Sequence, residues 1–332
     1  MSRILVTGAT GFLGHHLIPL LLARGDEVTA LVRNDEPALA AQGVKLARGD
    51  VLDGASVRAA AEGCAILLHC AGKVSRKPED AEELYRVHVE GTKVTLDASR
   101  EVGVERAVIA STSGVVAVTK EPDEVRNEKA PAPMDLLAPW PYYRSKLFAE
   151  KAAFDRNGPG FAVVAVNPTL LLGPGDERGS STGDVVQFLE RKVPFTPAGG
   201  LSFVDARDAA QGMVLAMDKG RAGERYLLSA INLTIEAFFG RLSRLSGVAA
   251  PRFKAPRSVL LARAGVGLFD SARRHLQIDV PLDRISAEMS QHFWYVDAAK
   301  ARTELGWSPR DPGDTLAETV EDLLGRGVVW PG

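Results

Sequence analysis

The sequence predicts an α/β fold with a doubly wound parallel sheet and a smaller, mostly helical C-terminal part. Three observations lead to this class. A glycine-rich turn joins an apolar strand to a helix at the start of the chain. Several short runs are continuously apolar, as buried parallel strands are, and these runs alternate with helical patterns. The length of 332 residues indicates about two domains.

The composition is that of an ordinary globular protein, with 45% hydrophobic and 25% charged residues. The formal net charge of -2 gives no electrostatic reason to expect a nucleic-acid partner. Cys64 and Cys70 are too few for a disulfide framework or a four-ligand zinc site. No apolar run approaches the ~20 residues that span a bilayer, and Met1 leads almost directly into the first strand. We therefore expect a cytoplasmic protein with no metal, no integral membrane segment and no nucleic-acid partner.

The first strand, Ile4-Leu5-Val6, leads through a glycine turn into an apolar helical pattern. Such a turn presents backbone N–H groups at a helix N-terminus, where the helix dipole favours a pyrophosphate. One glycine permits the tight turn, the next lets the backbone approach the phosphates, and the third lets helix and strand pack closely. We interpret the turn as a dinucleotide fingerprint of a Rossmann-type domain. Its predicted cofactor contacts are Gly8, Thr10, Gly11, Phe12, Leu13 and Gly14.

The second strand, residues 27–32, ends where the adenosine ribose of a dinucleotide would lie. An acidic residue at this point accepts the ribose hydroxyls of NAD, whereas an arginine pairs with the 2′-phosphate of NADP. Here Arg33 follows the strand, and no carboxylate occurs before Asp35. We predict that Arg33 favours NADP. NAD stays the alternative if Arg33 is only a solvated surface charge.

A further buried strand, residues 65–69, precedes the small turn Cys70-Ala71-Gly72. We expect these three residues to lie beneath the cofactor. His69 is expected to pack at the strand end, because no second histidine lies at ligand spacing.

Two groups of polar residues indicate one chemistry. The strand 107–110 runs into Ser111-Thr112-Ser113, at the edge where parallel sheets bind ligands. Tyr142 and Lys146 lie four residues apart in a helical pattern and so share one face. A nearby ammonium group lowers the pKa of a phenol, which is ~10 when unperturbed. Tyr142 would then exchange a proton with a carbonyl oxygen, and Ser113 would hydrogen-bond the same oxygen.

In chain order, these motifs resemble an extended short-chain dehydrogenase/reductase of the epimerase/dehydratase superfamily from end to end. The resemblance implies that Tyr142 is the acid/base and that Lys146 tunes it and binds the nicotinamide ribose. It also implies that Ser113 is the catalytic serine, with Ala117 in the place of the family's tyrosine and Thr112 as the fallback.

Two further segments gain a meaning from this resemblance. It implies that Asp50 and Val51 recognise the adenine, although Asp50 could instead cap a helix starting near Ser56. The Pro168-Thr169-Leu170 segment resembles dihydroflavonol reductases and their bacterial relatives, so Pro168 and Leu170 are predicted to meet the nicotinamide carboxamide. His88 stands where the family usually has an asparagine that supports the active-site geometry. It either replaces this asparagine or only packs.

The predicted cofactor domain comprises residues 1–174, and residues 201–232 return to it. The substrate domain is predicted to comprise 175–200 and 233–332. Within it, the stretch 252–277 could be a lid over an apolar substrate, a membrane-surface helix or an ordinary amphipathic helix. The proline-containing loop 119–141 is long enough to form a wall of the cleft.

These features favour an NADP(H)-dependent oxidoreductase that reduces a ketone or aldehyde to an alcohol, or the reverse, on a small molecule. One alternative is a nucleotide-sugar epimerase or dehydratase with tightly bound NAD(P), which would need a diphosphate-binding cation such as Arg178 or Arg207. Another is a hydroxysteroid-type dehydrogenase. A regulatory protein that only senses the cofactor would usually have lost the tyrosine and lysine. The resemblance implies a homodimer through two long helices of the cofactor domain.

Overall fold

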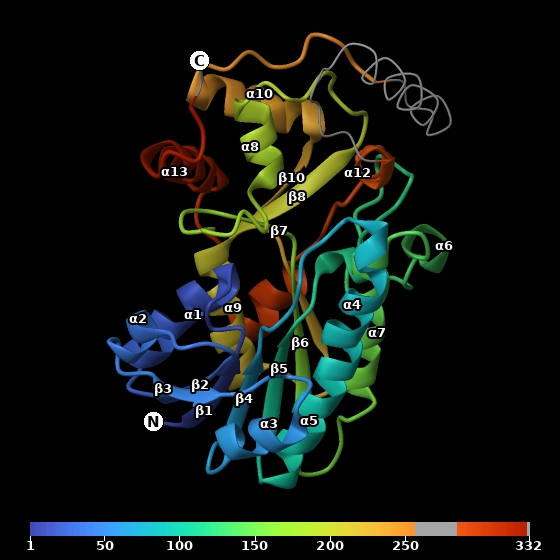
Figure 1. Ribbon diagram of the computed structural model, residues 1–332. Coiled ribbons are helices and arrows are strands. Elements are labelled where there is room, and N and C mark those ends of the chain that lie inside the picture. Colours follow the sequence, from blue (N-terminus) through green and yellow to red (C-terminus); the bar gives the residue numbers. More distant parts are fainter. Residues whose placement is uncertain (256–283, 331–332) are drawn as a thin grey trace.

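The computed structural model describes residues 1–255 and 284–330, which form a seven-stranded and a three-stranded sheet. The large sheet has the strand order β3-β2-β1-β4-β5-β6-β9, and every neighbouring pair is parallel. Helices cover both of its faces (Figure 1). The predicted doubly wound α/β class is thereby confirmed. The strands of this sheet are β1 (Arg3–Thr7), β2 (Glu27–Val32), β3 (Lys45–Arg48), β4 (Ile66–His69), β5 (Arg106–Ala110), β6 (Ala162–Pro168) and β9 (Arg225–Leu228).

Two apolar cores lie on opposite faces of the large sheet. On one face, the side chains of Ile4 and Val6 pack with Leu17 of α1 and Met213 of α9. On the other, Leu5 packs with residues of α3 and α5. The alternation of side chains along a strand sends neighbouring residues of β1 to different cores. The helices named are α1 (Phe12–Ala23), α3 (Gly54–Ala61), α5 (Gly91–Glu101) and α9 (Ala206–Lys219).

The helical segment between β4 and β5 is interrupted by a π-helical turn. It is formed by α4 (Ala81–Tyr85), the π-helical turn η2 (Arg86–Glu90) and α5. Such turns are rare and often occur at functional sites. Here the turn carries His88, whose ring is buried. The remaining elements of this half are α2 (Pro37–Ala40), η1 (Pro78–Asp80), η3 (Ser113–Val115), α6 (Met134–Leu137) and α7 (Pro141–Phe154).

The three-stranded sheet has the order β10-β8-β7 and lies beyond the carboxyl ends of the large sheet's strands (Figure 1). We call this part the small-sheet region. Residues 201–232 are shared between the two sheets, because β8 pairs with β7 and β10 whereas α9 and β9 join the large sheet. The elements of the small-sheet region are β7 (Leu170–Leu172), α8 (Gly183–Leu189), β8 (Gly200–Asp205), β10 (Ile231–Thr234), α10 (Ile235–Ser246), α12 (Arg284–Met289) and α13 (Pro312–Gly325). The π-helical turn η4 (Ala301–Leu305) instead packs in the core that α1 and α9 form with the large sheet.

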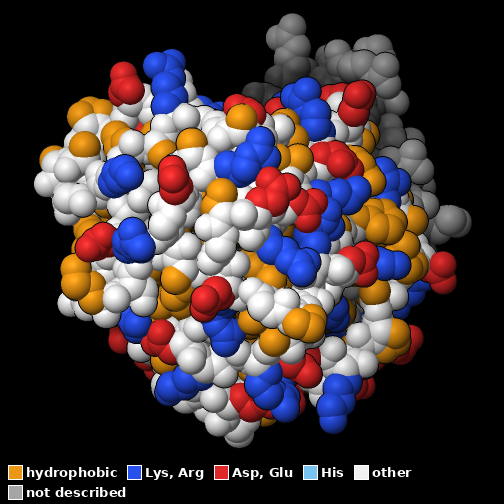
Figure 2. Space-filling view, turned by 90° about the horizontal axis from the view of Figure 1, so that it is seen from below, with side chains coloured by type: hydrophobic (Ala, Val, Ile, Leu, Met, Phe, Trp, Pro, Cys, Tyr) orange, Lys and Arg blue, Asp and Glu red, His pale blue; other side chains and the backbone are white. Residues whose placement is uncertain are grey.

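The face at the bottom of Figure 1 carries Lys and Arg interspersed with Asp and Glu and with small groups of hydrophobic side chains (Figure 2). Among the described residues, no helix combines the length and apolarity needed to cross a membrane. The same residues contain no cluster of three His, Cys, Asp or Glu that could hold a metal ion. Most of the stretch 252–277, interpreted above as a lid or amphipathic helix, lies outside the described residues.

Candidate active site

The carboxyl ends of β1, β2 and β3 lie side by side, so the segments that follow them share one edge of the sheet. These segments are the glycine turn, Arg33 and Asp50. The edge therefore brings together the residues predicted to contact the pyrophosphate, the ribose and the adenine. This is the edge at which open α/β sheets bind their ligands.

The glycine turn is packed too closely for side chains at two of its positions. Gly8 has φ +74°, and a Cβ there would lie 2.6 Å from Ala71 N. A Cβ at Gly14 would lie 2.2 Å from Gly8 O. The turn therefore contacts the Cys70-Ala71 segment directly, and α1 begins hard against it, as the sequence spacing predicted.

The N-terminus of α1 can receive an anion. Gly11 is its N-cap residue and no side chain caps it, so the first N–H groups lack capping partners from that position. A cavity of about 20 Å³ adjoins this turn, lined by Thr10, Gly11, Phe12, His15 and residues 175–178. The close-packed glycines and the helix N-terminus fit the pyrophosphate of a dinucleotide.

Arg33 and Asp50 occupy different environments on the same edge. Arg33 is exposed and makes no hydrogen bond or ion pair with any described residue. Asp50 is half-buried, and its carboxylate accepts a hydrogen bond from Leu52 N at 2.9 Å. The alternative prediction, that Asp50 caps the helix that follows it, is wrong. The N-cap residue of α3 is Asp53, whose carboxylate accepts a hydrogen bond from Ala55 N. Asp53 is nearer to the helix start and satisfies its first free N–H group.

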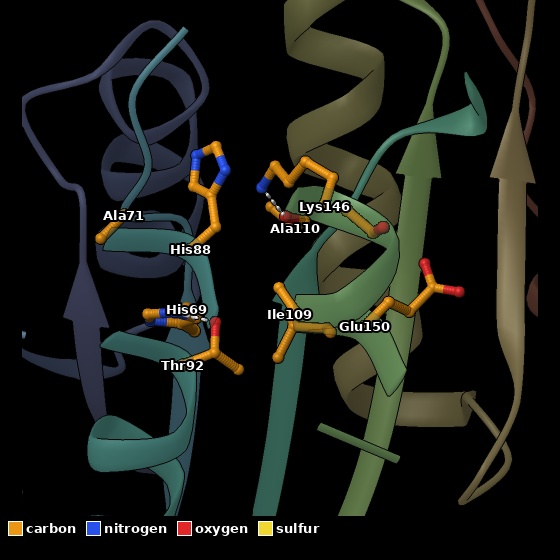
Figure 3. A pocket seen from close by; sticks show the side chains of 10 residues that line it. His69, Ala71, His88, Thr92, Ile109, Ala110, Lys146 and Glu150 are labelled. Atoms are coloured by element: carbon orange, nitrogen blue, oxygen red, sulfur yellow. Dashed lines mark hydrogen bonds between the residues drawn. The ribbon is translucent and has the colours of Figure 1, made fainter. Parts of the chain in front are cut away.

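The helix α7 begins with Pro141 at its first turn and carries Tyr142 and Lys146 on one face. The Lys146 Nζ donates to Ala110 O at 2.8 Å, at the carboxyl end of β5. A Cβ at Gly72 would lie 3.7 Å from the same Nζ. The structure thus brings Lys146 to the turn after β4 and to the end of β5 together (Figure 3).

Burial dominates the electrostatics of this pair. It raises the pKa of Tyr142, with Tyr143 adding to the rise. It lowers the pKa of Lys146 to about 8, against the opposing effects of Cys70 and Glu150. The expected lowering of the Tyr142 pKa by Lys146 is not found, because the Lys146 ammonium is directed to a backbone carbonyl and desolvation of the phenol prevails.

The serine and threonine that follow β5 have different roles. Thr112 caps the short helix η3 by accepting from Gly114 N at 3.3 Å. The Ser113 hydroxyl makes no hydrogen bond to any described residue. A Cβ at Gly114 would lie 2.2 Å from Tyr143 Cε1, so this turn packs directly on α7 next to Tyr142. The capping role of Thr112 leaves Ser113 as the freer hydroxyl, in line with the preferred assignment.

His88 uses both of its ring nitrogens. The Nδ1 lies 2.8 Å from Ser145 Oγ on α7, and the Nε2 accepts from Lys73 N at 3.1 Å. Burial and the charge of Lys146 lower its pKa to about 2, so the ring is neutral. His88 therefore ties the π-helical turn to α7 and to the loop after β4, a positioning contact that the sequence left undecided.

Two residues of this site were missed in the sequence. Asn167, which is fully buried, donates through Nδ2 to Glu150 Oε2 at 2.6 Å and to Thr112 O at 3.1 Å. It thereby joins α7 to the turn that carries Ser113. Glu150 lies one helical turn beyond Lys146, and that spacing was the available signal. Nothing local marks Asn167, since its partners are distant in the chain.

A cavity of about 10 Å³ lies behind Lys146 and is bounded by His69, His88 and Glu150 (Figure 3). Ser111 also lines it, and its buried Oγ has no hydrogen-bond partner among the described residues. The His69 ring lies between Thr7 Oγ1 at 2.8 Å and Thr92 Oγ1 at 3.1 Å, which confirms its packing role.

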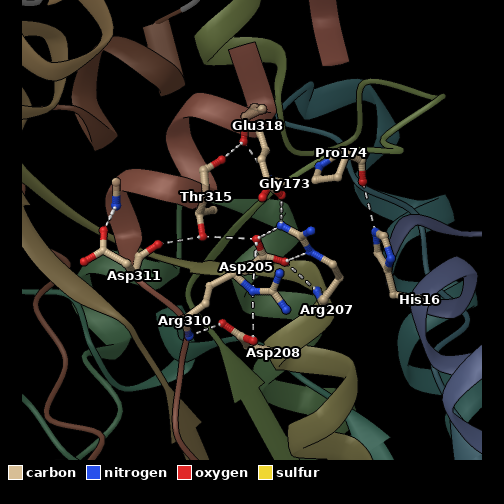
Figure 4. Close-up of polar contacts among 12 residues, drawn as sticks. His16, Gly173, Pro174, Asp205, Arg207, Asp208, Arg310, Asp311, Thr315 and Glu318 are labelled. Atoms are coloured by element: carbon tan, nitrogen blue, oxygen red, sulfur yellow. Dashed lines mark hydrogen bonds and ion pairs between the residues drawn. The ribbon is translucent and has the colours of Figure 1, made fainter. Parts of the chain in front are cut away.

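The two arginines considered for a substrate diphosphate have other surroundings. Arg207 forms ion pairs with Asp205 and Glu318 at the junction of β8, α9 and α13 (Figure 4). Arg178 Nη2 donates to Thr10 Oγ1 at 3.2 Å, over the glycine turn.

The fold and this site define a Rossmann-type enzyme that uses a nicotinamide dinucleotide. The family model "NAD dependent epimerase/dehydratase family" matches residues 4–229. The chain belongs to this family, as its resemblance to extended short-chain dehydrogenases implied.

Two curated relatives match almost the whole chain. One is the "Putative dihydroflavonol 4-reductase" of Synechocystis sp., 34% identical over 98% of this chain and 95% of the relative. Another is the "Sterol demethylase protein B" of Methylococcus capsulatus, 33% identical over 98% of this chain and 99% of the relative. Among solved structures, "Crystal structure of gox2253" matches with a TM-score of 0.85 and 28% identity, covering 99% of this chain and 100% of that chain.

Proposed function

We propose that this protein is an NADP(H)-dependent oxidoreductase that interconverts a carbonyl group and an alcohol on a small organic molecule. The observation that carries the proposal is the contact of Lys146 Nζ with Ala110 O. This contact holds the face of α7 that bears Tyr142 against the strand end that leads to Ser113. It also lies beside the turn after β4, which packs on the glycine turn.

Each of the three side chains has a distinct task. Tyr142 holds its proton at neutral pH, since burial raises its pKa. It would give that proton to the substrate's carbonyl oxygen as negative charge develops on that oxygen. Ser113 donates a hydrogen bond to the same oxygen as negative charge develops. Lys146, whose pKa burial lowers to about 8, stays mostly protonated at neutral pH. It holds α7 against the end of β5 through Ala110 O, and we assign it the binding of the nicotinamide ribose.

The nicotinamide cofactor supplies the hydride when bound. We assign its binding to the following residues: the glycine turn for the pyrophosphate, Asp50 and Val51 for the adenine, and Cys70, Ala71, Gly72, Pro168 and Leu170 for the nicotinamide. Arg33 supports a preference for NADP, because it directly follows β2 and its exposed guanidinium, which has no partner among the described residues, is able to pair with a 2′-phosphate.

A reductase accounts for the arginines better than an epimerase does. A nucleotide-sugar substrate needs a cation for its diphosphate, yet Arg207 is neutralised by two carboxylates and Arg178 lies over the cofactor's glycine turn. The name of the Synechocystis relative supports a reductase as well. The name of the Methylococcus relative favours a second candidate, a hydroxysteroid-type dehydrogenase. Hydroxysteroids therefore belong in the substrate screen beside simple ketones and aldehydes.

The nicotinamide content of the purified, untreated protein tests this proposal. We expect little retained nucleotide and tighter binding of added NADPH than of NADH. About one tightly held nucleotide per chain would instead support an epimerase or dehydratase, which regenerates its cofactor during each cycle. Carbonyl substrates would then be screened by NADPH oxidation.

We further propose a homodimer in which two long helices of the cofactor domain form the interface. Tyr85 of α4 and Phe148 of α7 support this, since both are large, hydrophobic and exposed in the single chain. Sedimentation equilibrium at micromolar concentration measures the oligomeric state, and a monomer there would contradict the proposal.

A further inference from the structure

The loop after β7 extends over the glycine turn. We call residues 173–182 the strap. Its Arg178 Nη2 donates to Thr10 Oγ1 at 3.2 Å. The cavity of about 20 Å³ at the start of α1 lies between the strap and the glycine turn, with Gly11 and Phe12 on one side and residues 175–178 on the other. A group bound at the N-terminus of α1 would therefore touch both.

The first three residues of the strap are held between two helices. Gly173 N donates to Thr319 Oγ1 at 2.8 Å, and Gly175 N donates to Asp322 Oδ2 at 3.2 Å, both on α13. On the other side, His16 Nε2 of α1 lies 3.0 Å from Pro174 O (Figure 4). The strap thus spans from α13 to the first helix of the large sheet.

Hydrogen bonds to Asp176 also fix the interior of the strap. The Asp176 carboxylate is buried and accepts from Ser180 N at 3.0 Å and Thr182 N at 2.9 Å. Asp176 also lines the cavity, and these bonds occupy its carboxylate and fix the residues that follow it. Arg178 lies between Asp176 and the residues that donate to it, so its backbone has little remaining freedom, and this lowers the entropic cost of binding a ligand.

Two charged residues of the strap line the cavity with exposed side chains, Glu177 and Arg178. Glu177 would repel an anion there, so Arg178 decides whether the strap attracts one. A guanidinium can donate two parallel hydrogen bonds to phosphate oxygens. The N-terminus of α1 contributes its own partial positive charge from the opposite side.

We propose that Arg178 binds the pyrophosphate of the dinucleotide, with the strap as its fixed support from the small-sheet region. The inference rests on the proposed function only in requiring a dinucleotide. It assigns Arg178 to the cofactor and not to a substrate diphosphate. It also separates two arginines by the phosphate they meet, because Arg33 would bind the 2′-phosphate.

The test measures dissociation constants by fluorescence and calorimetric titration, without turnover. We compare Arg178→Gln, Arg178→Lys and Arg33→Ala, using NADPH, NADH, ADP-ribose and 2′-AMP as probes. Arg178→Gln should weaken NADPH, NADH and ADP-ribose alike, by about tenfold, and should leave 2′-AMP within twofold. Arg33→Ala should weaken NADPH and 2′-AMP while sparing NADH and ADP-ribose.

Arg302→Gln is the matched control, because it removes one exposed positive charge on η4, outside this cavity. It should leave all four probes unchanged. Arg178→Lys should recover part of the lost affinity. Intact 2′-AMP binding checks that the Arg178 and Arg302 variants are folded, and intact NADH binding checks the same for Arg33→Ala. Unchanged NADPH and NADH binding in Arg178→Gln would overturn the strap proposal alone. A wild-type protein that binds neither NADPH nor NADH would overturn the proposed function and this inference together.

Discussion

Two buried polar clusters of this protein differ in how completely their polar groups are paired. At the junction of β8, α9 and α13, each described carboxylate has a cationic partner. At the end of β5, around Tyr142 and Lys146, several buried polar atoms have no hydrogen-bond partner among the described residues. We call the first the carboxylate junction, formed by Asp205, Arg207, Asp208, Arg310, Thr315 and Glu318, and the second the Tyr-Lys edge, formed by Ser111, Ser113, Tyr142, Lys146 and Asn167.

The carboxylate junction satisfies the charges that it buries (Figure 4). Burial alone would raise the pKa of Asp205, but hydrogen bonds from Arg207 and the nearby charges outweigh it, and the pKa is lowered. Thr315 Oγ1 adds a further bond at 3.0 Å, and Arg310 pairs with Asp208 at 3.1 Å. Such a cluster holds elements together, and its carboxylates neutralise the charge of its arginines.

The Tyr-Lys edge does the reverse. Ser111 Oγ and Asn167 Oδ1 are buried without a hydrogen-bond partner among the described residues. Burial raises the pKa of Tyr142 and lowers that of Lys146, so both side chains are shifted in favour of their neutral forms. The contrast teaches that buried polar residues serve the fold where their charges are matched, and indicate a reaction site where they are not.

The largest effect is expected from Tyr142→Phe. Removing the proton donor should lower kcat by about 10²- to 10⁴-fold, while NADPH affinity stays within a few-fold. Steady-state kinetics and NADPH titration measure the two quantities. Tyr143→Phe, which changes the neighbouring ring on α7, is the matched control and should keep most activity. Near-full activity in Tyr142→Phe would remove the acid/base role from this residue.

The carboxylate junction should respond through stability. Asp205→Asn removes the buried carboxylate that pairs with the half-buried guanidinium of Arg207, and should lower the free energy of unfolding by about 3 kcal/mol. Denaturant unfolding measures this loss. Asp218→Asn is the control, because its ion pair with Arg24 is exposed and should contribute less than about 1 kcal/mol. Equal losses in the two variants would show that the carboxylate junction stabilises the fold no more than an exposed ion pair does.

Lys146→Met should destroy activity and yet stabilise the fold. The folded pKa of Lys146 is about 8 and its ordinary value is 10.5. The unfolded chain therefore binds this proton more tightly, and folding loses on the order of 3 kcal/mol at pH 7. The penalty is fully present below pH ~8 and fades as the pH rises toward ~10.5. Thermal unfolding at pH 7 and pH 9.5 should show a gain for the variant that shrinks at the higher pH; a destabilised variant at pH 7 would contradict it.

The smallest effect is the acid sensitivity of the buried histidines. Burial lowers the pKa of His69 to about 3 and that of His88 to about 2, whereas both protonate near 6.5 when unfolded. Stability should therefore fall as the pH drops below ~6.5, by about 1.4 kcal/mol per pH unit for each ring. His88→Asn should reduce this slope, as measured by urea unfolding between pH 7 and 5. Parallel slopes for the variant and the wild type would assign the acid loss to other groups.

Much of the fold was predictable because its signals are local. The turn containing Gly8, Gly11 and Gly14 needs only the strand before it and the helix after it. The buried parallel strands are apolar on both faces, so each is recognisable by itself. The family followed from the order of such motifs. The cofactor contacts and the roles of Ser113, Tyr142 and Lys146 stay predictions that the geometry supports.

The remaining features depend on contacts between distant segments. The sequence alone predicted that Arg33 follows the end of a strand and that Tyr142 and Lys146 share one face of a helix. Both predictions need only the local pattern of one segment. Only the tertiary structure decided that Asn167 joins Glu150 to the carbonyl of Thr112, that Arg207 is neutralised at β8 and that Arg178 lies on Thr10. It also decided that the pKa of Tyr142 is raised. Desolvation and hydrogen bonding are set by every element packed around a group, and spacing along one chain segment does not contain that information.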